Sequence, residues 1–253
     1  MNDSNKILKD TFDRIAAGFG EIADFRRITV LGRRSARDVV EMENAEIARA
    51  VASDPSYREL FTDADELLRV MGGESGFSSK VTEFQVTRYD LAVDSASLIF
   101  AHSIVDAALY DLCRATAYAR PEAWEPFVEK RTFAVAEIKG RSFESLLIEK
   151  IGLLLIDLER KSMMEKADQL FRLAKPTRDF EPIKSYAFDR ERLSSLDQMR
   201  NDVVHVKSAR IPLPQGDEDI LFLRRTVLYF VAMVSRYFGV RIIANPSGPK
   251  SEV

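Results

Sequence analysis

Cysteine, histidine and tryptophan are scarce in this chain, whose 253 residues include one cysteine, two histidines and one tryptophan. The single cysteine, Cys113, excludes an intrachain disulfide and fits a reducing compartment. The paired Glu-x-x-His elements of a di-iron bundle are not present, because Ile99 lies three residues before His102. The segment DVVH at 202–205 has the spacing of one such element, but no second element completes it. We therefore expect no metal and no cofactor.

Several motifs of catalysis and membrane insertion are also missing. We find no phosphate-binding glycine loop, no dinucleotide fingerprint, no CxxC pair and no nucleophile elbow. The most apolar run, LLIEKIGLLLIDL at 146–158, is too short and too often interrupted by charge to span a bilayer. The amino terminus, MNDSNKILKD, is polar and lacks a signal-peptide core. The sequence predicts a cytoplasmic protein that does not bind membranes.

The overall composition is that of an ordinary globular protein, with 46% hydrophobic and 30% charged residues. A net charge of −3 argues against a surface that is basic throughout, as duplex binding would favour. It does not exclude a local phosphate site, because a few convergent arginines are enough at short range. The length allows one large domain or two small ones.

Helical periodicity dominates the first third of the chain. One apolar stripe recurs at steps of three and four residues, formed by Ile7, Leu8, Phe12, Ile15, Phe19 and Ile22. Ser35 is a candidate N-cap for a second helix that runs to about Ala52, and Pro55 begins a third that ends at the Gly72-Gly73 pair. The small residues of GGESGFSSK at 72–80 indicate a boundary between two regions.

The rest of the chain predicts a five-helix unit. A long helix spans about 90–119, and the two prolines of RPEAWEPFVEK interrupt it. Ser142 begins the next helix, and Ser162 with Glu165 has the spacing of a capping box that begins a shorter one. Asp189 caps a fourth helix, and the last spans 220–238. We expect an all-α protein with a helical extension at 1–78, a helical domain at 85–242 and a disordered tail at 243–253.

The fourth of these helices carries the segment RNDVVH at 200–205. Asn201 and His205 lie one turn apart, and Arg200 lies about 140° around the helix from His205. An imidazole can exchange protons with a ribose hydroxyl or a leaving oxygen, and a guanidinium can hold the phosphate between them. Arg200 could also reach the same helix of a second copy across a symmetric dimer. This chemistry is that of metal-independent RNA cleavage.

The segment RNDVVH resembles the signature of HEPN domains, which is an arginine followed on a helix by a polar residue, three further residues and a histidine. The resemblance covers roughly residues 88–242, where SLIFAHSIVDAALYDLCRATA is similar to the first long HEPN helix. It implies a helical bundle that acts as a dimeric endoribonuclease in toxin–antitoxin, CRISPR-associated or phage-defence systems. Arg200, Asn201 and His205 would be the catalytic residues, and Asp106 would orient Arg200. Lys207 stands where related toxins often carry a tyrosine, so an adenylylation switch is not expected there.

Other residues have two interpretations each. Four basic residues flank the motif and are expected to guide RNA toward it, namely Lys207, Arg210, Arg224 and Arg225. His102 is either a core histidine or part of the same cleft. Trp124 either anchors a loop or stacks on a base.

Two other functions remain open beside RNA cleavage. The first is a HEPN-like module that binds RNA or a nucleotide without cutting. The second is a helical adaptor whose residues 1–78 form an arm for a partner or for dimerisation, because the apolar stripe between Ile7 and Ile22 is suited to either. The expected partners are RNA and a second copy of the chain, and they could include an antitoxin or another protein.

Overall fold

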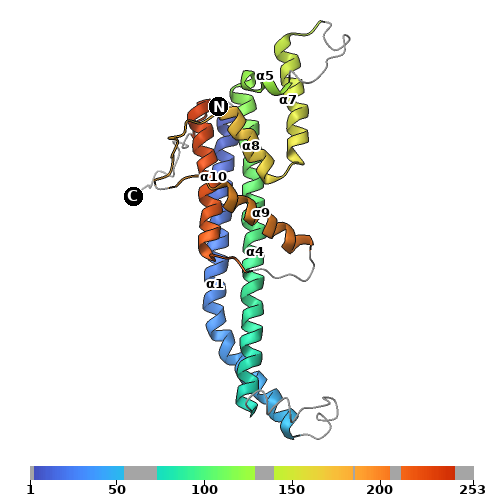
Figure 1. Ribbon diagram of the computed structural model, residues 1–253, viewed down its shortest axis with the longest axis vertical. Coiled ribbons are helices and arrows are strands. Elements are labelled where there is room, and N and C mark those ends of the chain that lie inside the picture. The colour runs from blue at the N-terminus through green and yellow to red at the C-terminus, as the bar shows by residue number, and fades with distance from the viewer. Residues whose placement is uncertain (1–2, 54–72, 129–139, 185, 206–211, 243–253) are drawn as a thin grey trace, which may run out of the picture.

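The computed structural model describes residues 3–53, 73–128, 140–184, 186–205 and 212–242. All regular structure within these ranges is helical, which confirms the predicted all-α fold (Figure 1). The elements in chain order are α1 (Asp3–Ser53), α4 (Gly73–Ala119), the short 3-10 helix η1 (Pro121–Trp124), α5 (Glu125–Val128), α7 (Phe143–Glu159), α8 (Met163–Ala174), α9 (Arg190–His205) and α10 (Asp217–Phe238).

Two very long helices, α1 and α4, form an antiparallel hairpin that runs the length of the molecule (Figure 1). Arg14 of α1 lies 2.5 Å from Asp111 near one end of the pair, and Asn44 donates to Thr82 at 3.0 Å near the other. Because an α-helix rises 1.5 Å per residue, each helix is roughly 70 Å long. Helices α7, α8, α9 and α10 each contact this hairpin through α4.

The hydrophobic core lies at the end of the hairpin where α8, α9 and α10 pack against it. Leu8, Ile15, Phe19 and Ile22 of α1 are all at most 4% exposed, and they belong to the same core cluster as residues of α4, α8 and α10. The apolar stripe that we considered as a partner surface is therefore buried in the core of its own chain. Residues 3–22 belong to the same bundle as the expected 85–242 domain.

The structure replaces two of the predicted N-terminal helices with one. We expected a helix start at Ser35, but α1 continues without interruption from Asp3 to Ser53. Gly73–Lys80, which we expected to form a flexible boundary, belong to the first turns of α4. The physical reason is tertiary, because each long helix packs against the other and this contact outweighs the weak helix propensity of glycine and serine. The third predicted helix, at 55–72, lies outside the described residues.

The carboxyl-terminal helices begin where their caps predict. The Ser142 side chain accepts a hydrogen bond from the Ser145 backbone at the start of α7. Ser162 and Glu165 form both hydrogen bonds of a capping box at the start of α8. The predicted break after α4 is also present, since η1 begins at Pro121.

One stretch of α4, Ser79–Ala119, is long and apolar enough by composition to cross a membrane. Core helices of soluble proteins pass the same test, and the carboxyl-terminal half of α4 carries much of this core. The finding is therefore weak evidence for a membrane segment.

Candidate functional site on helix α9

Helix α9 is anchored to the bundle at its start and is free at its end. The Asp189 side chain accepts a hydrogen bond of 2.9 Å from the Arg192 backbone, as the predicted cap requires. One and two turns later, Leu193 and Leu196 are 0% and 2% exposed within the core. The helix then crosses α4, and its last turns extend past the bundle, so that His205 is exposed (Figure 1). The RNDVVH segment occupies this transition.

A hydrogen bond between His102 and Asp197 holds α9 against α4 immediately before the motif. His102 Nε2 lies 2.5 Å from Asp197 Oδ1, and the two side chains are 8% and 17% exposed. His102 is thus a core histidine with a carboxylate partner, and it does not line an open cleft. Because Asp197 lies one turn before Asn201, this pair fixes the position of the motif relative to α4.

Arg200 is half-buried on the side of α9 that faces the bundle, one turn after Leu196. Its Nη1 donates to the Asn201 side-chain oxygen at 3.0 Å. Its Nε is buried, and nothing within the described residues accepts its hydrogen. The guanidinium therefore has donors to spare, next to an amide that helps to hold it.

His205 is exposed as the last residue of α9. No hydrogen bond or ion pair of His205 is found among the residues that the structure describes. Since Arg200 faces the bundle and His205 faces solvent, α9 of one chain presents them on different sides.

Asp106 does not contact Arg200, contrary to the role that the resemblance implied. Both carboxylate oxygens accept hydrogen bonds from Lys166 Nζ of α8, at 2.7 and 2.8 Å. The reason lies in the packing of α4: His102 meets α9, and Asp106, one turn further along, is already beside α8. Asp106 is thus the partner of a lysine whose side chain is only 3% exposed.

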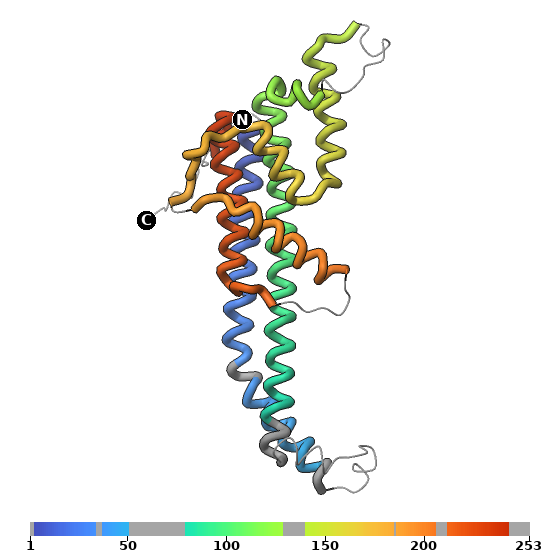
Figure 2. Tube along the Cα trace, viewed as in Figure 1, coloured from blue at the N-terminus to red at the C-terminus, as the bar shows by residue number. Residues whose placement is uncertain are grey.

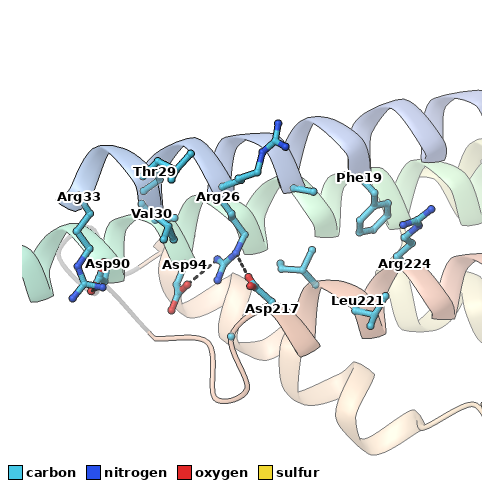
Figure 3. A pocket seen from close by; sticks show the side chains of 16 residues that line it. Phe19, Arg26, Thr29, Val30, Arg33, Asp90, Asp94, Asp217, Leu221 and Arg224 are labelled. Atoms are coloured by element: carbon cyan, nitrogen blue, oxygen red, sulfur yellow. Dashed lines mark hydrogen bonds and ion pairs between the residues drawn. The ribbon is translucent and has the colours of Figure 1, made fainter. Parts of the chain in front are cut away.

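The basic residues expected to guide RNA do not all lie near the motif. Lys207 and Arg210 lie outside the described residues. Arg224 and Arg225 are exposed on α10, and Arg224 lines a cavity of about 740 Å³ between α1, α4 and the start of α10 (Figure 3). The structure therefore places Arg224 against the hairpin, and nothing described brings it to α9.

In that cavity Arg26 is held between two carboxylates (Figure 3). Its Nη1 lies 2.8 Å from Asp94 of α4, and its Nε lies 2.5 Å from Asp217 of α10. Burial by itself lowers the pKa of Arg26, but the hydrogen bonds and charges of the two aspartates outweigh it and the net shift is upward. This arginine therefore connects α1, α4 and α10. Because the two carboxylates offset its positive charge, it is not suited to bind an anionic ligand.

Trp124 is the anchor of the loop after α4. It is 1% exposed, and its indole nitrogen donates to Thr116 Oγ1 at 3.2 Å. A buried ring cannot stack on a base, so the structural interpretation of this residue is confirmed.

Sequence reasoning missed Asp197 and Lys166, the partners of His102 and Asp106. They lie 95 and 60 residues away along the chain, and no local pattern signals such a pairing. Within the described ranges, no group of three or more His, Cys, Asp or Glu residues could hold a metal ion. Comparisons with protein-family models, with curated proteins and with solved structures found no match. The candidate site is therefore argued from its residues alone.

Proposed function

We propose that this protein is a cytoplasmic, metal-independent endoribonuclease of the HEPN type, acting as a homodimer on single-stranded or looped RNA. The observation that carries the proposal is the exposed imidazole of His205 at the free end of α9, five residues after a half-buried arginine with spare donors. An acid–base group must reach solvent and substrate. A phosphate-binding group benefits from partial burial, because a lower local dielectric strengthens its bonds to an anion.

The reaction needs no group beyond those on α9 and the RNA itself. Neutral His205 takes the proton of a ribose 2′-hydroxyl, and the oxygen attacks the adjacent phosphorus. The bond from phosphorus to the 5′-oxygen breaks, and an imidazolium returns a proton to that oxygen. The products are a 2′,3′-cyclic phosphate and a 5′-hydroxyl. Arg200 stabilises the charge that develops on the phosphoryl oxygens, and Asn201 positions the guanidinium.

A second copy supports this mechanism in two ways. In one chain Arg200 and His205 lie on different sides of α9, whereas two antiparallel α9 ends could each supply one of them to the same phosphate. A pair of histidines also provides the base and the acid at once. The exposed Val204 gives the free end of α9 an apolar contact for such a pairing.

The first test is RNA cleavage by the full chain in EDTA. His205→Ala should abolish cleavage while leaving the helical circular dichroism unchanged, and Glu191→Gln, an exposed change at the other end of α9, should leave the rate unchanged. RNA with a single 2′-deoxy nucleotide at the cleaved position should resist. Cleavage that persists in His205→Ala, or that requires Mg²⁺, would contradict the mechanism. RNA binding without cleavage across many substrates would favour the non-catalytic alternative.

A second test asks whether the site is shared between chains. His205→Ala and Arg200→Ala should each be inactive, and mixing them should restore part of the wild-type rate, because half of the dimers are then heterodimers in which the intact His205 of one chain meets the intact Arg200 of the other. If the mixture of exchanged chains stays inactive, both residues act from the same chain.

A further inference from the structure

The far half of the α1–α4 hairpin has no third helix beside it among the described residues (Figures 1 and 2). The contact between the two helices in this half is largely polar. Thr29, Asn44 and Thr82 are at most 8% exposed within it, and Arg33 lies 3.0 Å from Asp90. A two-helix contact of this kind buries little apolar surface, which is the main source of stability for helix pairs.

Large apolar side chains lie instead on the outside of this half. On α1, Phe25, Ile28, Val39 and Met42 are between 42% and 64% exposed. They fall on one line of positions, 25, 28, 32, 35, 39 and 42, which we call the hairpin stripe. Its steps of three and four residues are those of a coiled-coil seam, and such a seam fits another helix.

Helix α4 adds two aromatic rings on the same side of the hairpin. Phe100 is 60% exposed and lines a groove of about 450 Å³ together with Phe25. Tyr89, three helical turns earlier on α4, is 48% exposed. Neither ring lines the cavity of Figure 3, where α10 packs. The apolar surface therefore extends over both helices on the uncovered side.

We propose that this surface binds a second copy of the chain, with the two hairpins packed antiparallel as a four-helix bundle. The hairpin stripe is nearly symmetric about a point between residues 33 and 34. A two-fold axis there sets Phe25 against Met42 of the partner subunit and Ile28 against Val39 of the partner subunit. It sets Gly32 beside position 35, and a Cβ added at Gly32 would meet nothing within 4 Å. Isologous contacts require this self-complementarity, and small residues at the centre let the backbones approach.

The exposed area is enough for a specific contact. Six large side chains per chain are roughly half exposed, namely Phe25, Ile28, Val39, Met42, Tyr89 and Phe100. At about 100 Å² each they would remove roughly 600 Å² per copy and 1,200 Å² in total, the lower limit for stable specific interfaces. Glu21 and Glu46 occupy the next positions of the stripe and end its apolar part at both sides. We expect a reversible dimer that dissociates into monomers at low protein concentration.

This contact is independent of the proposed nuclease site. His102 meets α9 on a side of α4 that lies about 160° around the helix from Phe100. A dimer through the hairpin therefore leaves the α9 ends uncovered. It can form whether or not two α9 ends meet.

The experiment is sedimentation equilibrium of the full chain over a wide concentration range. Ile28→Glu and Val39→Glu should each weaken self-association at least tenfold, because each places a charge in the apolar centre of the contact. Phe84→Glu is the matched control: Phe84 is 61% exposed but lies about 160° around α4 from Phe100, so it should associate as wild type does. A wild-type chain that stays monomeric, or three variants that associate equally, would overturn the proposal.

A second measurement tests the register and does not depend on the stability of charged variants. Ile28→Cys and Val39→Cys chains should form a disulfide-linked pair when mixed and oxidised, and Ile28→Cys alone should not. The native thiol, Cys113, is buried and should not interfere. Equal crosslinking of Ile28→Cys alone would overturn the antiparallel register. Sedimentation of the chain with phosphatidylcholine–phosphatidylglycerol vesicles, lost in Ile28→Glu and without self-association in free solution, would assign the surface to a membrane instead.

Discussion

The ion pair between Asp106 and Lys166 gives the sharpest test of how the bundle is held together. The Lys166 side chain is only 3% exposed, and both of its described hydrogen bonds go to the Asp106 carboxylate. Asp106→Asn keeps the size of the side chain but removes its charge, which leaves an ammonium group buried without a counter-ion. Removing one member of a buried pair costs about 3–5 kcal/mol. Because the Asp106 side chain is 34% exposed and water can reach it, we expect a cost below that range, about 2–3 kcal/mol.

The reverse substitution should cost less. In Lys166→Met the remaining carboxylate is a third exposed and can be hydrated, so we expect about 1 kcal/mol or less. The double variant Asp106→Leu with Lys166→Met removes both charges and should be closer to wild type than Asp106→Asn. The free energy of unfolding is measured by urea titration, followed by circular dichroism at 222 nm. In a parallel thermal melt, a loss of 1 kcal/mol lowers the melting temperature by roughly 2–4 °C.

The same series separates structure from catalysis. If Asp106 serves α8 alone, Asp106→Asn loses stability, and its cleavage rate below the unfolding transition stays near that of wild type. If Asp106→Asn is as stable as wild type but cleaves poorly, the carboxylate acts on Arg200, as the resemblance to HEPN domains implied, and our assignment of the ion pair is refuted.

Two further predictions concern single groups. The hydrogen bond from the Ser162 backbone N–H is the largest cause that lowers the pKa of Glu165. The charged Glu165 therefore stabilises the fold above its ordinary pKa of 4.5, and this stabilisation is lost as the pH falls through the lower native pKa. Melting temperatures measured from pH 3 to 7 should therefore fall less on acidification in Glu165→Gln than in wild type, and Ser162→Ala should cost about 1 kcal/mol at pH 7. Burial raises the pKa of the Cys113 thiol well above its usual value, with only a small opposing effect of Lys166. The native chain should not react with 5,5′-dithiobis(2-nitrobenzoate) at pH 8, and it should react once in guanidinium; rapid native labelling would show that the site opens.

The parts of the fold that depend on neighbouring residues could be predicted from the sequence. Ser142, Ser162 and Asp189 each accept a backbone hydrogen bond three residues later, and this interaction is decided within one turn. The end of α4 before Pro121 is equally local, because proline cannot continue a helix from the residue before it without strain.

The continuity of α1 could not be predicted in this way. Gly32 and Ser35 are poor helix formers, and read locally they indicate a break. The helix passes through them because α4 runs alongside, with Arg33 bonded to Asp90 and Arg26 to Asp94 at matching heights. These contacts join residues more than fifty positions apart, and a window of one or two turns contains no information about them.

The same distinction between local and long-range interactions applies to the candidate site. The sequence identified Arg200, Asn201 and His205, because their spacing on one helix is local. It assigned Asp106 to the wrong neighbour in the structure, because that choice depends on whether α8 or α9 covers a given turn of α4. Family resemblance supplies roles, but only the packing decides which groups can reach one another.

The two self-association surfaces that we propose constrain one another through symmetry. A contact between α9 ends and a contact between hairpins are both isologous, and they lie on different sides of α4. A chain with both can close as a tetramer only if the two two-fold axes intersect at right angles; axes that do not intersect give an open chain of dimers. Closure would give an assembly of fixed mass with two nuclease sites. An open chain would give a mass that rises with concentration and that Ile28→Glu should cut back to dimers. The concentration dependence of the wild-type mass thus shows how the two-fold axis at the hairpin is oriented relative to the axis at α9. Neither contact studied alone would reveal this orientation.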